Sequence, residues 1–216
     1  MSVTVEYSHL SLAEVAYLDL RDRLVTLQIA PGSPINDERI AAELKIGRTP
    51  VREALKRLEA ERLVVSYPRR GTFATEVQIT DLGHITEVRQ KLEPLAASCA
   101  ARRAGTEHKL ALTTLLDELD ASAEADVSAL MQLDLRTHRA LYAATSNPFL
   151  EDTLVRYDNL ATRIWCLFIG RLPSLAGHIN EHGPLVRAVL AGDEDQASLL
   201  ATEHVARFES AIRALL

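Results

Sequence analysis

The apolar positions between residues 36 and 63 predict two short helices separated by a tight turn. Most of them are three to five positions apart, a spacing that brings side chains to one face of a helix. They are Ile40, Leu44, Ile46, Val51, Leu55, Leu58 and Leu63. The interruption falls at residues 45–47. The second helix is expected to open near Arg48 or Thr49, with Thr49 as its N-cap and Pro50 in the first helical position, where the missing N–H costs nothing.

The outward side of this second helix is basic. Opposite its apolar stripe lie Arg48, Thr49, Arg52, Lys56 and Arg57. Residues 63–67 then predict a strand, 68–71 a turn and 72–75 a returning strand, with Arg69 and Arg70 at the tip of the hairpin. Between residues 45 and 70 there are eight Lys/Arg and three Asp/Glu, a local charge of +5, whereas the whole chain carries −6. Local charge governs contact with phosphate groups, so the segment predicts a winged helix-turn-helix that binds DNA.

The same segment resembles the winged helix of GntR-family bacterial transcription regulators. The resemblance is carried by Ala30-Pro31-Gly32, by Arg48-Thr49-Pro50-Val51-Arg52-Glu53-Ala54-Leu55-Lys56-Arg57-Leu58-Glu59 and by Gly71-Thr72-Phe73. It implies that Arg48, Thr49 and Arg52 touch the operator and that Gly71 lets the wing approach the minor groove. The chain departs from the family pattern at Lys45 and Gly47, where the turn usually carries Gly and Ser. It departs again at Glu38, where many members have Arg. These departures leave the operator sequence open.

Helical periodicity accounts for the rest of the chain. Ser11 can cap a helix that runs to about residue 28, ahead of the winged segment. Beyond a linker near residues 76–80, helical stripes cover about 81–104, 107–124, 126–145, 148–170, 174–191 and 193–214. The predicted fold class is mainly α, with a winged helix-turn-helix domain at residues 1–77 and an all-helical bundle at residues 78–216.

The bundle segment resembles the FCD effector domain of the FadR subgroup of GntR regulators. The matching pieces, in order, are Arg89-Gln90-Lys91-Leu92-Glu93, Asp134-Leu135-Arg136-Thr137-His138, Ser146-Asn147-Pro148-Phe149-Leu150, Glu181-His182, Ala191-Gly192-Asp193 and His204. The resemblance implies a domain that dimerises and binds a small organic acid. With the wing, it extends over nearly the whole chain.

Asp134 and His138 are four residues apart and therefore lie on one face of a helix, where they offer half of a site for a divalent ion. The FCD resemblance places Asp134, His138, His182 and His204 at the metal-ligand positions of the family. One oxygen and three nitrogen donors suit Zn²⁺ or Ni²⁺, with Mn²⁺ a weaker candidate. His178 competes with these residues, being four before His182. His9, His84 and His108 are interpreted as surface residues.

Arg89 is the predicted effector-binding residue, because FCD proteins hold an arginine toward the effector cavity at this position. A guanidinium binds a carboxylate through two parallel hydrogen bonds. Arg139 and Arg163 are alternatives for the same part. Trp165, Phe168 and Tyr157 could line the cavity, although core packing is the favoured interpretation for each.

Composition bounds the cellular setting. The 216 residues are 47% hydrophobic and 25% charged, as in ordinary globular proteins, and no apolar run reaches the roughly 18 residues that span a bilayer. The N-terminus lacks the pattern of a secretory signal, and Cys99 and Cys166 fit reduced thiols, so a cytoplasmic location without membrane contact is expected. Residues 1–77 carry no net charge, so the acidic excess lies wholly beyond them.

Three functions follow from these features in order of preference. The first is a transcription regulator, favoured as a repressor. It would bind a pseudo-palindromic operator on double-stranded DNA as a homodimer and respond to a small carboxylate effector. The second is a structural DNA-binding protein with a metal but no effector. The third is a metalloenzyme with an accessory DNA-binding domain. The enzyme is disfavoured, because the sequence contains no H-E-x-x-H, no G-x-S-x-G and no phosphate-binding glycine loop. Effector identity, metal identity, operator sequence and the direction of the response stay open.

Overall fold

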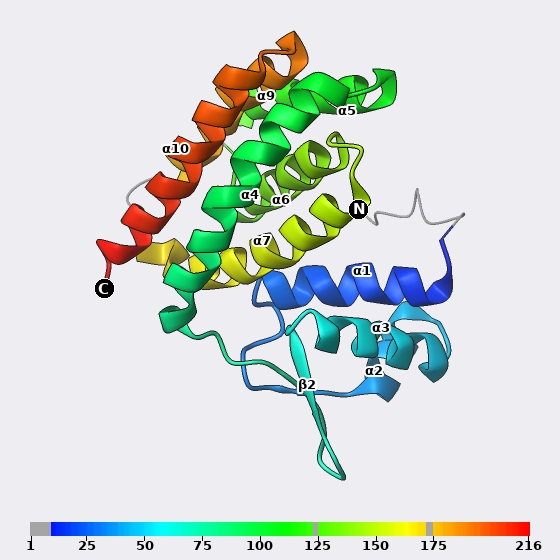
Figure 1. The fold of residues 1–216 in the computed structure, drawn as a ribbon. Helices are drawn as coiled ribbons and strands as arrows, with labels where there is room; N and C mark the ends of the chain where they lie inside the picture. Colours follow the sequence, from blue (N-terminus) through cyan, green and yellow to red (C-terminus); the bar gives the residue numbers. More distant parts are fainter. Residues whose placement is uncertain (1–9, 123–124, 172–174) are drawn as a thin grey trace. The chain divides into compact units, whose positions relative to one another are not determined.

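The computed structural model describes residues 10–122, 125–171 and 175–216 (Figure 1). The chain forms two compact units, the first ending at Val77 and the second beginning at Gln78. The predicted N-terminal tail, residues 1–9, and the predicted helix boundary at Pro173 lie outside the described residues. Among the described helices, none is both long and apolar enough to cross a membrane.

The first unit packs three helices around a small apolar core. They are α1 (Leu12–Val25), α2 (Asp37–Leu44) and α3 (Arg48–Ala60). Ser11 caps α1 as expected, its Oγ accepting a hydrogen bond from the Glu14 amide at 3.1 Å. The core between the helices is fully buried and contains Leu20, Leu24, Val51 and Leu58. Burial of these side chains supplies the stability that helices of this length lack in isolation.

The turn between α2 and α3 differs in one detail from the prediction. The N-cap of α3 is Gly47, and the helix already begins at Arg48, so the expected capping role of Thr49 is wrong. Gly47 has an extended backbone and offers no side-chain cap, whereas Lys45, the C-cap of α2, has φ of 56°. Because the left-handed Lys45 already reverses the chain, the helical conformation can start two residues before Pro50, the predicted first helical position.

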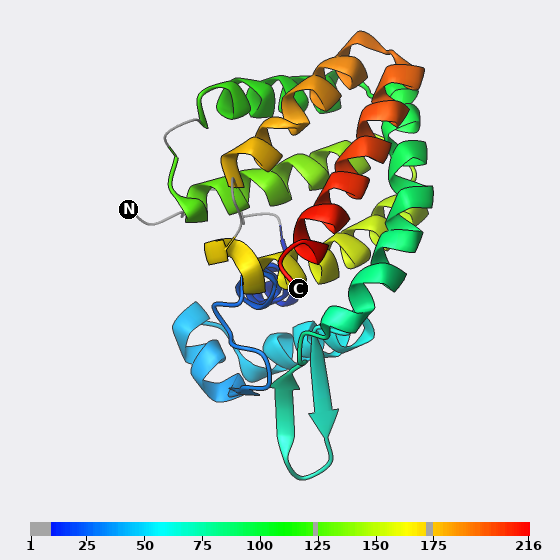
Figure 2. The same cartoon turned by 90° about the vertical axis from the view of Figure 1, so that its left-hand side faces the viewer.

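The wing is the hairpin of β2 (Val64–Tyr67) and β3 (Gly71–Ala74), which extends away from the helices of its unit (Figure 2). The two strands are antiparallel, with Ser66 opposite Thr72. A third strand, β1 (Pro34–Ile35), pairs with the other edge of β3. The sequence did not predict β1, because two residues are too few to show an alternating pattern. Gly71 has φ of 93°, a conformation that a glycine adopts without strain at the turn of the hairpin.

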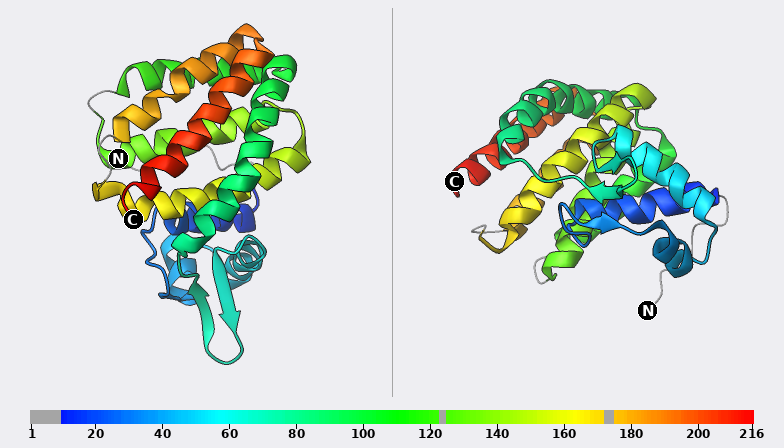
Figure 3. Two further views of the ribbon diagram at one scale, coloured as in Figure 1. Left: turned by 60° about the vertical axis from the view of Figure 1, so that its left-hand side comes forward. Right: turned by 90° about the horizontal axis from the view of Figure 1, so that it is seen from below.

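The second unit is helical throughout its described residues. After the short η2 (Ile79–Asp81) come α4 (Leu82–Arg103), α5 (Thr106–Asp120), α6 (Val127–Ala143), α7 (Pro148–Phe168), η4 (Ile169–Arg171), α8 (Leu175–Asn180), α9 (His182–Ala191) and α10 (Glu194–Arg213). The long helices α4 and α10 lie along each other (Figures 1 and 3). Buried alanines of both helices belong to one core cluster, and such small side chains allow a close approach of the two axes. The winged helix-turn-helix and the helical bundle confirm the predicted fold class.

One predicted helix is divided in two. Instead of a single helix over 174–191, α8 ends at Asn180 and α9 begins at His182. Pro184 explains the break, because a proline has no N–H to donate to the preceding turn and is tolerated only near the start of a helix. The break has a consequence for the site, since it fixes where His182 projects.

Candidate functional site

The basic face of α3 is exposed and faces acidic groups at the start of α2. Arg48, Thr49, Arg52 and Lys56 are all exposed. Arg52 Nε donates to Asp37 Oδ2 at 2.7 Å, and Arg48 contacts both Asp37 and Glu38. Burial alone would raise the pKa of Asp37, but hydrogen bonds from Arg52 and Arg48 hold it below its ordinary value. The arginines are therefore positioned by carboxylates before any nucleic acid is present.

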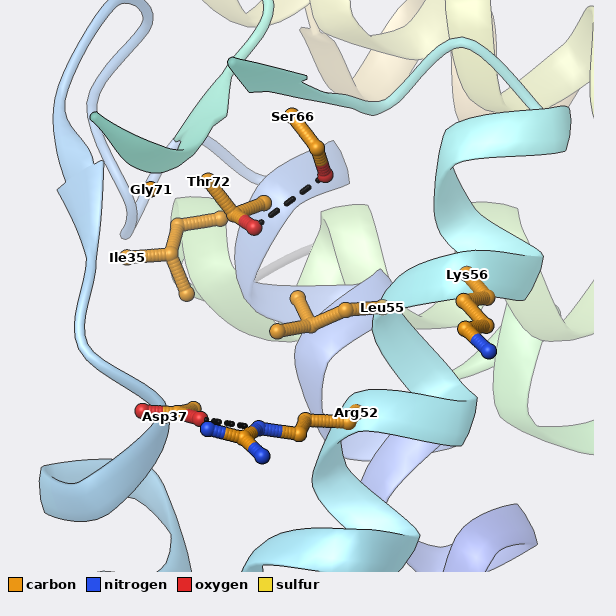
Figure 4. A pocket seen from close by; sticks show the side chains of 8 residues that line it. All are labelled: Ile35, Asp37, Arg52, Leu55, Lys56, Ser66, Gly71 and Thr72. Atoms are coloured by element: carbon orange, nitrogen blue, oxygen red, sulfur yellow. Dashed lines mark hydrogen bonds and ion pairs between the residues drawn. The ribbon is translucent and has the colours of Figure 1, made fainter. Parts of the chain in front are cut away.

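A cleft of about 390 Å³ separates α3 from the sheet (Figure 4). It is lined by Ile35, Asp37, Arg52, Leu55, Lys56, Ser66, Gly71 and Thr72. Arg69 and Arg70 are exposed at the hairpin tip beside Gly71. The structure thus joins the predicted recognition helix and the predicted wing at one groove.

Arg57 lies apart from the other predicted DNA contacts. Its guanidinium stacks over the Tyr17 ring at 3.5 Å and donates to Glu14 Oε2 at 2.8 Å, both of which belong to α1. A second acid, Glu61, lies 3.4 Å from Arg57 Nε. These contacts give Arg57 a packing role between α3 and α1. Its predicted contact with DNA would require the side chain to leave this position.

The four predicted metal ligands converge inside the second unit. Asp134 and His138 project from α6, His182 from α9 and His204 from α10. The Nε2 atoms of His138 and His182 are 3.1 Å apart, and Asp134 Oδ1 lies 3.6 Å from His182 Nε2. The rings of His182 and His204 have centroids 4.5 Å apart. Donor atoms of His138, His182 and His204 all lie within 4.8 Å of one another, as a shared metal ion requires.

The outer nitrogens of the histidines are directed by neighbouring hydrogen-bonding groups. His182 Nδ1 lies 3.1 Å from the Ile179 carbonyl oxygen, which can only accept, so Nδ1 carries the proton and Nε2 the lone pair. His204 Nδ1 lies 3.0 Å from Glu181 Oε2, a carboxylate oxygen that likewise accepts the Nδ1 proton. His138 Nδ1 lies 3.1 Å from the Tyr142 hydroxyl. Such partners fix the ring orientation of metal-binding histidines, and the two oxygen acceptors also fix the tautomers of His182 and His204.

The donor set fits a divalent ion. Asp134 Oδ1 is buried and accepts no hydrogen bond from the described residues. An unpaired buried carboxylate oxygen is costly unless a cation compensates it. Burial lowers the pKa of His182 to about 4 and those of His138 and His204 well below their ordinary value, so all three imidazoles are neutral. Neutral imidazole is the form that binds metals.

Arg89 lies next to this cluster but is already paired. It is buried on α4, where Nε donates to Glu93 Oε1 at 2.5 Å and Nη2 lies 3.4 Å from Asp158 Oδ1. Glu93 Oε2 and Asp158 Oδ1 each lie 3.9 Å from a ring nitrogen of His138. Burial works against the charge of Arg89, yet Glu93 together with neighbouring groups raises its pKa. An effector carboxylate that reached Arg89 would have to share it with Glu93 and Asp158.

His178 borders the cluster from outside. Its ring lies 4.4 Å from that of His204 and 3.8 Å from that of Trp165. His178, Glu181 and His204 form a second group with metal-binding spacing, so the competition between His178 and the other histidines stays open. Trp165, Phe168 and Arg163 are buried, whereas Tyr157 and Arg139 are partly exposed.

Family models match both units. The model "Bacterial regulatory proteins, gntR family" matches residues 12–74, and the model "FCD domain" matches residues 84–207. The chain belongs to the GntR family of bacterial regulators, in the subgroup with an FCD domain. The resemblance inferred from the sequence is thereby confirmed.

Several named GntR-type relatives extend over most of the chain. The Nta operon transcriptional regulator of Aminobacter aminovorans is 30% identical over 84% of this chain and 85% of that protein. The HTH-type transcriptional repressor GlaR of Escherichia coli is 29% identical over 88% and 90%. A solved structure, E. coli McbR/YncC, shares the fold with a TM-score of 0.82 at 22% identity, over 95% and 99%. These relatives are transcriptional regulators, which agrees with the prediction that this GntR-family member is not an enzyme.

Sequence reasoning missed several residues that surround the site of this GntR-family chain. Glu93 follows Arg89 by four residues, so the helical spacing could have identified their pairing. Glu181 precedes His182 in the chain, but its contact with His204 joins two helices. Asp158 and Asp37 had no local signal, because their arginine partners lie far away in the sequence.

Proposed function

We propose that this GntR-family regulator is a repressor whose operator affinity is controlled by a small organic acid. The convergence of Asp134, His138, His182 and His204 carries the proposal. These residues would hold a divalent ion, with Zn²⁺ or Ni²⁺ favoured by the three imidazoles. When bound, the ion would supply positive charge that attracts a carboxylate of the acid.

The chain's own residues would complete the effector site. Arg89 offers a guanidinium beside His138, held in place by Glu93 and Asp158. A charged acid entering this buried region needs a partner for its carboxylate, because an unpaired buried charge is strongly disfavoured. Competition for Arg89 would then change the contacts of α4.

The first unit would bind the operator. Arg48, Thr49 and Arg52 would contact base edges, guanine being the usual partner of arginine. Lys56, Arg57, Arg69 and Arg70 would contact phosphates and the flanking groove, and Gly71 would allow the wing to approach the minor groove. Since one recognition helix reads a short half-site, a homodimer on a pseudo-palindromic operator is proposed, in the cytoplasm where the DNA lies.

Regulation requires that the acid distinguish two arrangements of the dimer. An acid that binds the DNA-free arrangement more tightly lowers operator affinity by the ratio of the two affinities. We propose this releasing sense, in which repression ends when the acid accumulates.

A thermal-shift screen of metabolic carboxylic acids tests the effector. Metal-loaded and chelator-stripped protein are screened in parallel, because a ligand specific for the native state raises the melting temperature by mass action. A free acid at about 100 times its Kd should stabilise the loaded protein by about 2.7 kcal/mol and leave the stripped protein unchanged. Absence of stabilisation in both forms would contradict the effector proposal and favour a structural role for the metal.

Replacing His182 by alanine should lower the metal content of the purified protein. His182 is fully buried and its Nε2 faces both Asp134 and His138, so its removal takes a central donor from the cluster. Loss of one ligand or its partners weakens metal sites by at least about tenfold. Elemental analysis after dialysis provides the measurement. His84→Ala, at an exposed position, is the control that keeps the metal, and His178→Ala decides whether that histidine also binds. An unchanged metal-to-protein ratio in the His182 variant would contradict the ligand set.

A further inference from the structure

One carboxylate at the start of α2 holds two arginines of α3. Asp37 Oδ2 accepts a hydrogen bond from Arg52 Nε at 2.7 Å, and Arg48 Nη2 lies 3.2 Å from both carboxylate oxygens. Figure 4 shows Arg52 extending from α3 to Asp37 along the edge of the cleft. We infer that Asp37 is a positioning residue for base recognition, which fixes Arg52 so that its terminal nitrogens face the DNA. This inference rests on the proposed operator binding by α3.

Asp37 is the better anchored partner in this arrangement. It occupies the first position of α2, whose N-cap Asn36 accepts a hydrogen bond from the Arg39 amide at 2.9 Å. The Asp37 side chain is 23% exposed, whereas those of Arg48 and Arg52 are 46% and 61% exposed. A short side chain on a capped helix has few rotamers, so it restricts the long arginine rather than following it.

The hydrogen bonds leave the two arginines with different free donors. Arg52 uses Nε for Asp37, and no hydrogen bond from its Nη1 or Nη2 is found among the described residues. Two parallel N–H groups from these atoms match the O6 and N7 acceptors of guanine. Arg48 instead has Nη1 bonded to Glu38 at 2.5 Å and Nη2 directed to Asp37. Arg48 must therefore break its hydrogen bond to Glu38 before this nitrogen can contact a base. Arg52 can retain its hydrogen bond to Asp37 while its terminal nitrogens contact a base.

Glu38 and Asp37 are therefore expected to have opposite effects on base recognition: Glu38 hinders it, and Asp37 supports it. Glu38 competes with DNA for Arg48, and the repulsion between its charge and phosphate adds to this competition. Asp37 also repels phosphate, but it restricts Arg52 to one orientation before binding, which lowers the entropic cost of the bidentate contact. If Asp37 acted only through its charge, its removal would raise the affinity for every DNA sequence by one common factor.

Equilibrium binding of matched variants tests the inference. The probes are a duplex selected by the wild-type protein from a random-sequence pool and a shuffled duplex of the same composition. Asp37→Asn and Glu38→Gln each remove one negative charge, so both should bind the shuffled duplex more tightly by similar factors. Asp37→Asn should lower the ratio of selected to shuffled affinity about tenfold, whereas Glu38→Gln should not lower it.

A panel of single-base-pair variants of the selected duplex gives the decisive readout. Asp37→Asn should lose discrimination at the same base pair as Arg52→Ala. Asp37→Glu keeps the charge but displaces the carboxylate by one methylene, so it should lose discrimination at that base pair without tighter binding to the shuffled duplex. Circular dichroism and melting temperature check that each variant is folded.

Failure of the inference and failure of the proposed function give different results. If Asp37→Asn and Asp37→Glu keep the wild-type ratio while Arg52→Ala loses it, the positioning role is overturned and the recognition helix stands. If Arg52→Ala also keeps the ratio, Arg52 reads no base of the operator, and its proposed role in operator recognition is overturned together with the inference.

Discussion

Replacing Arg89 by alanine is expected to lower the free energy of unfolding by about 3–5 kcal/mol. Arg89 is the guanidinium between Glu93 and Asp158, and all three side chains are at most 4% exposed. Removing the cation leaves two carboxylates in a region that excludes water, next to the neutral His138. Removing one partner of a buried ion pair lowers stability by far more than the intact pair contributes to it. The reason is that nothing then offsets the desolvation cost of the remaining charge.

Chemical denaturation of metal-loaded and stripped protein measures this loss. Arg136→Ala is the matched control, since Arg136 pairs with Glu118 on the surface of the same unit, with both side chains more than 40% exposed. An exposed pair contributes about 0–1 kcal/mol, so the control should be nearly as stable as the wild type. Adding Glu93→Gln to the Arg89 variant should recover part of the loss by removing one unpaired charge. Equal stability of the Arg89 and Arg136 variants would contradict the buried network.

This prediction also bears on the proposed control by an effector. The Arg89 network joins His138, a predicted metal ligand, to α4, which begins only five residues after the first unit ends at Val77. An acid that competes for Arg89 would change the contacts of the helix that directly follows the linker. Allosteric control requires that the acid bind one arrangement of the dimer more tightly than the other. A change in the contacts of α4 would be one way to provide this difference.

The winged unit could be predicted in most of its detail, because its signals are local. The apolar spacing around Val51 and Leu58, the hairpin and the exposure of Arg48 and Arg52 all follow from short stretches of sequence. The miss at Thr49 is also local, since the backbone of Lys45 and not the side chain of Thr49 decides where α3 begins. Two-residue strands such as β1 carry no periodic signal and become visible only when β3 is present to pair with them.

The metal cluster was less accessible to such reasoning. Helical spacing alone united only Asp134 with His138, and it equally favoured His178 with His182. Family resemblance supplied His182 and His204, whose meeting with His138 depends on how α9 and α10 pack against each other and against α4 in the bundle. The partners of Arg89 show the same limit, because Glu93 lies one turn away but Asp158 comes from α7. Long-range packing determines these contacts, and spacing within one helix does not report it.

Replacing Arg52 by alanine is expected to abolish specific operator binding while leaving the fold intact. Arg52 is exposed on α3, so its removal opens no cavity in the core. A good bidentate contact to a base provides about 1–3 kcal/mol of discrimination. A homodimer would lose it in both half-sites, so the expected loss is about 2–6 kcal/mol, which corresponds to roughly 30-fold to 10⁴-fold in affinity.

Gel shifts at physiological salt, with the duplex selected by the wild-type protein, measure this effect. Arg62→Ala is the charge-matched control. Arg62 is exposed just beyond the C-terminal end of α3, whereas Arg48 lies at its N-terminal end. It removes the same charge from the same unit, so it reports the general electrostatic contribution, which acts on all sequences alike. Both variants should weaken binding to a shuffled duplex slightly and equally, and only Arg52→Ala should lose the preference for the selected one. If the two variants instead bound the selected duplex equally well, base recognition would have to come from Arg48, Thr49 or the wing, and Arg52 would serve only to hold phosphate.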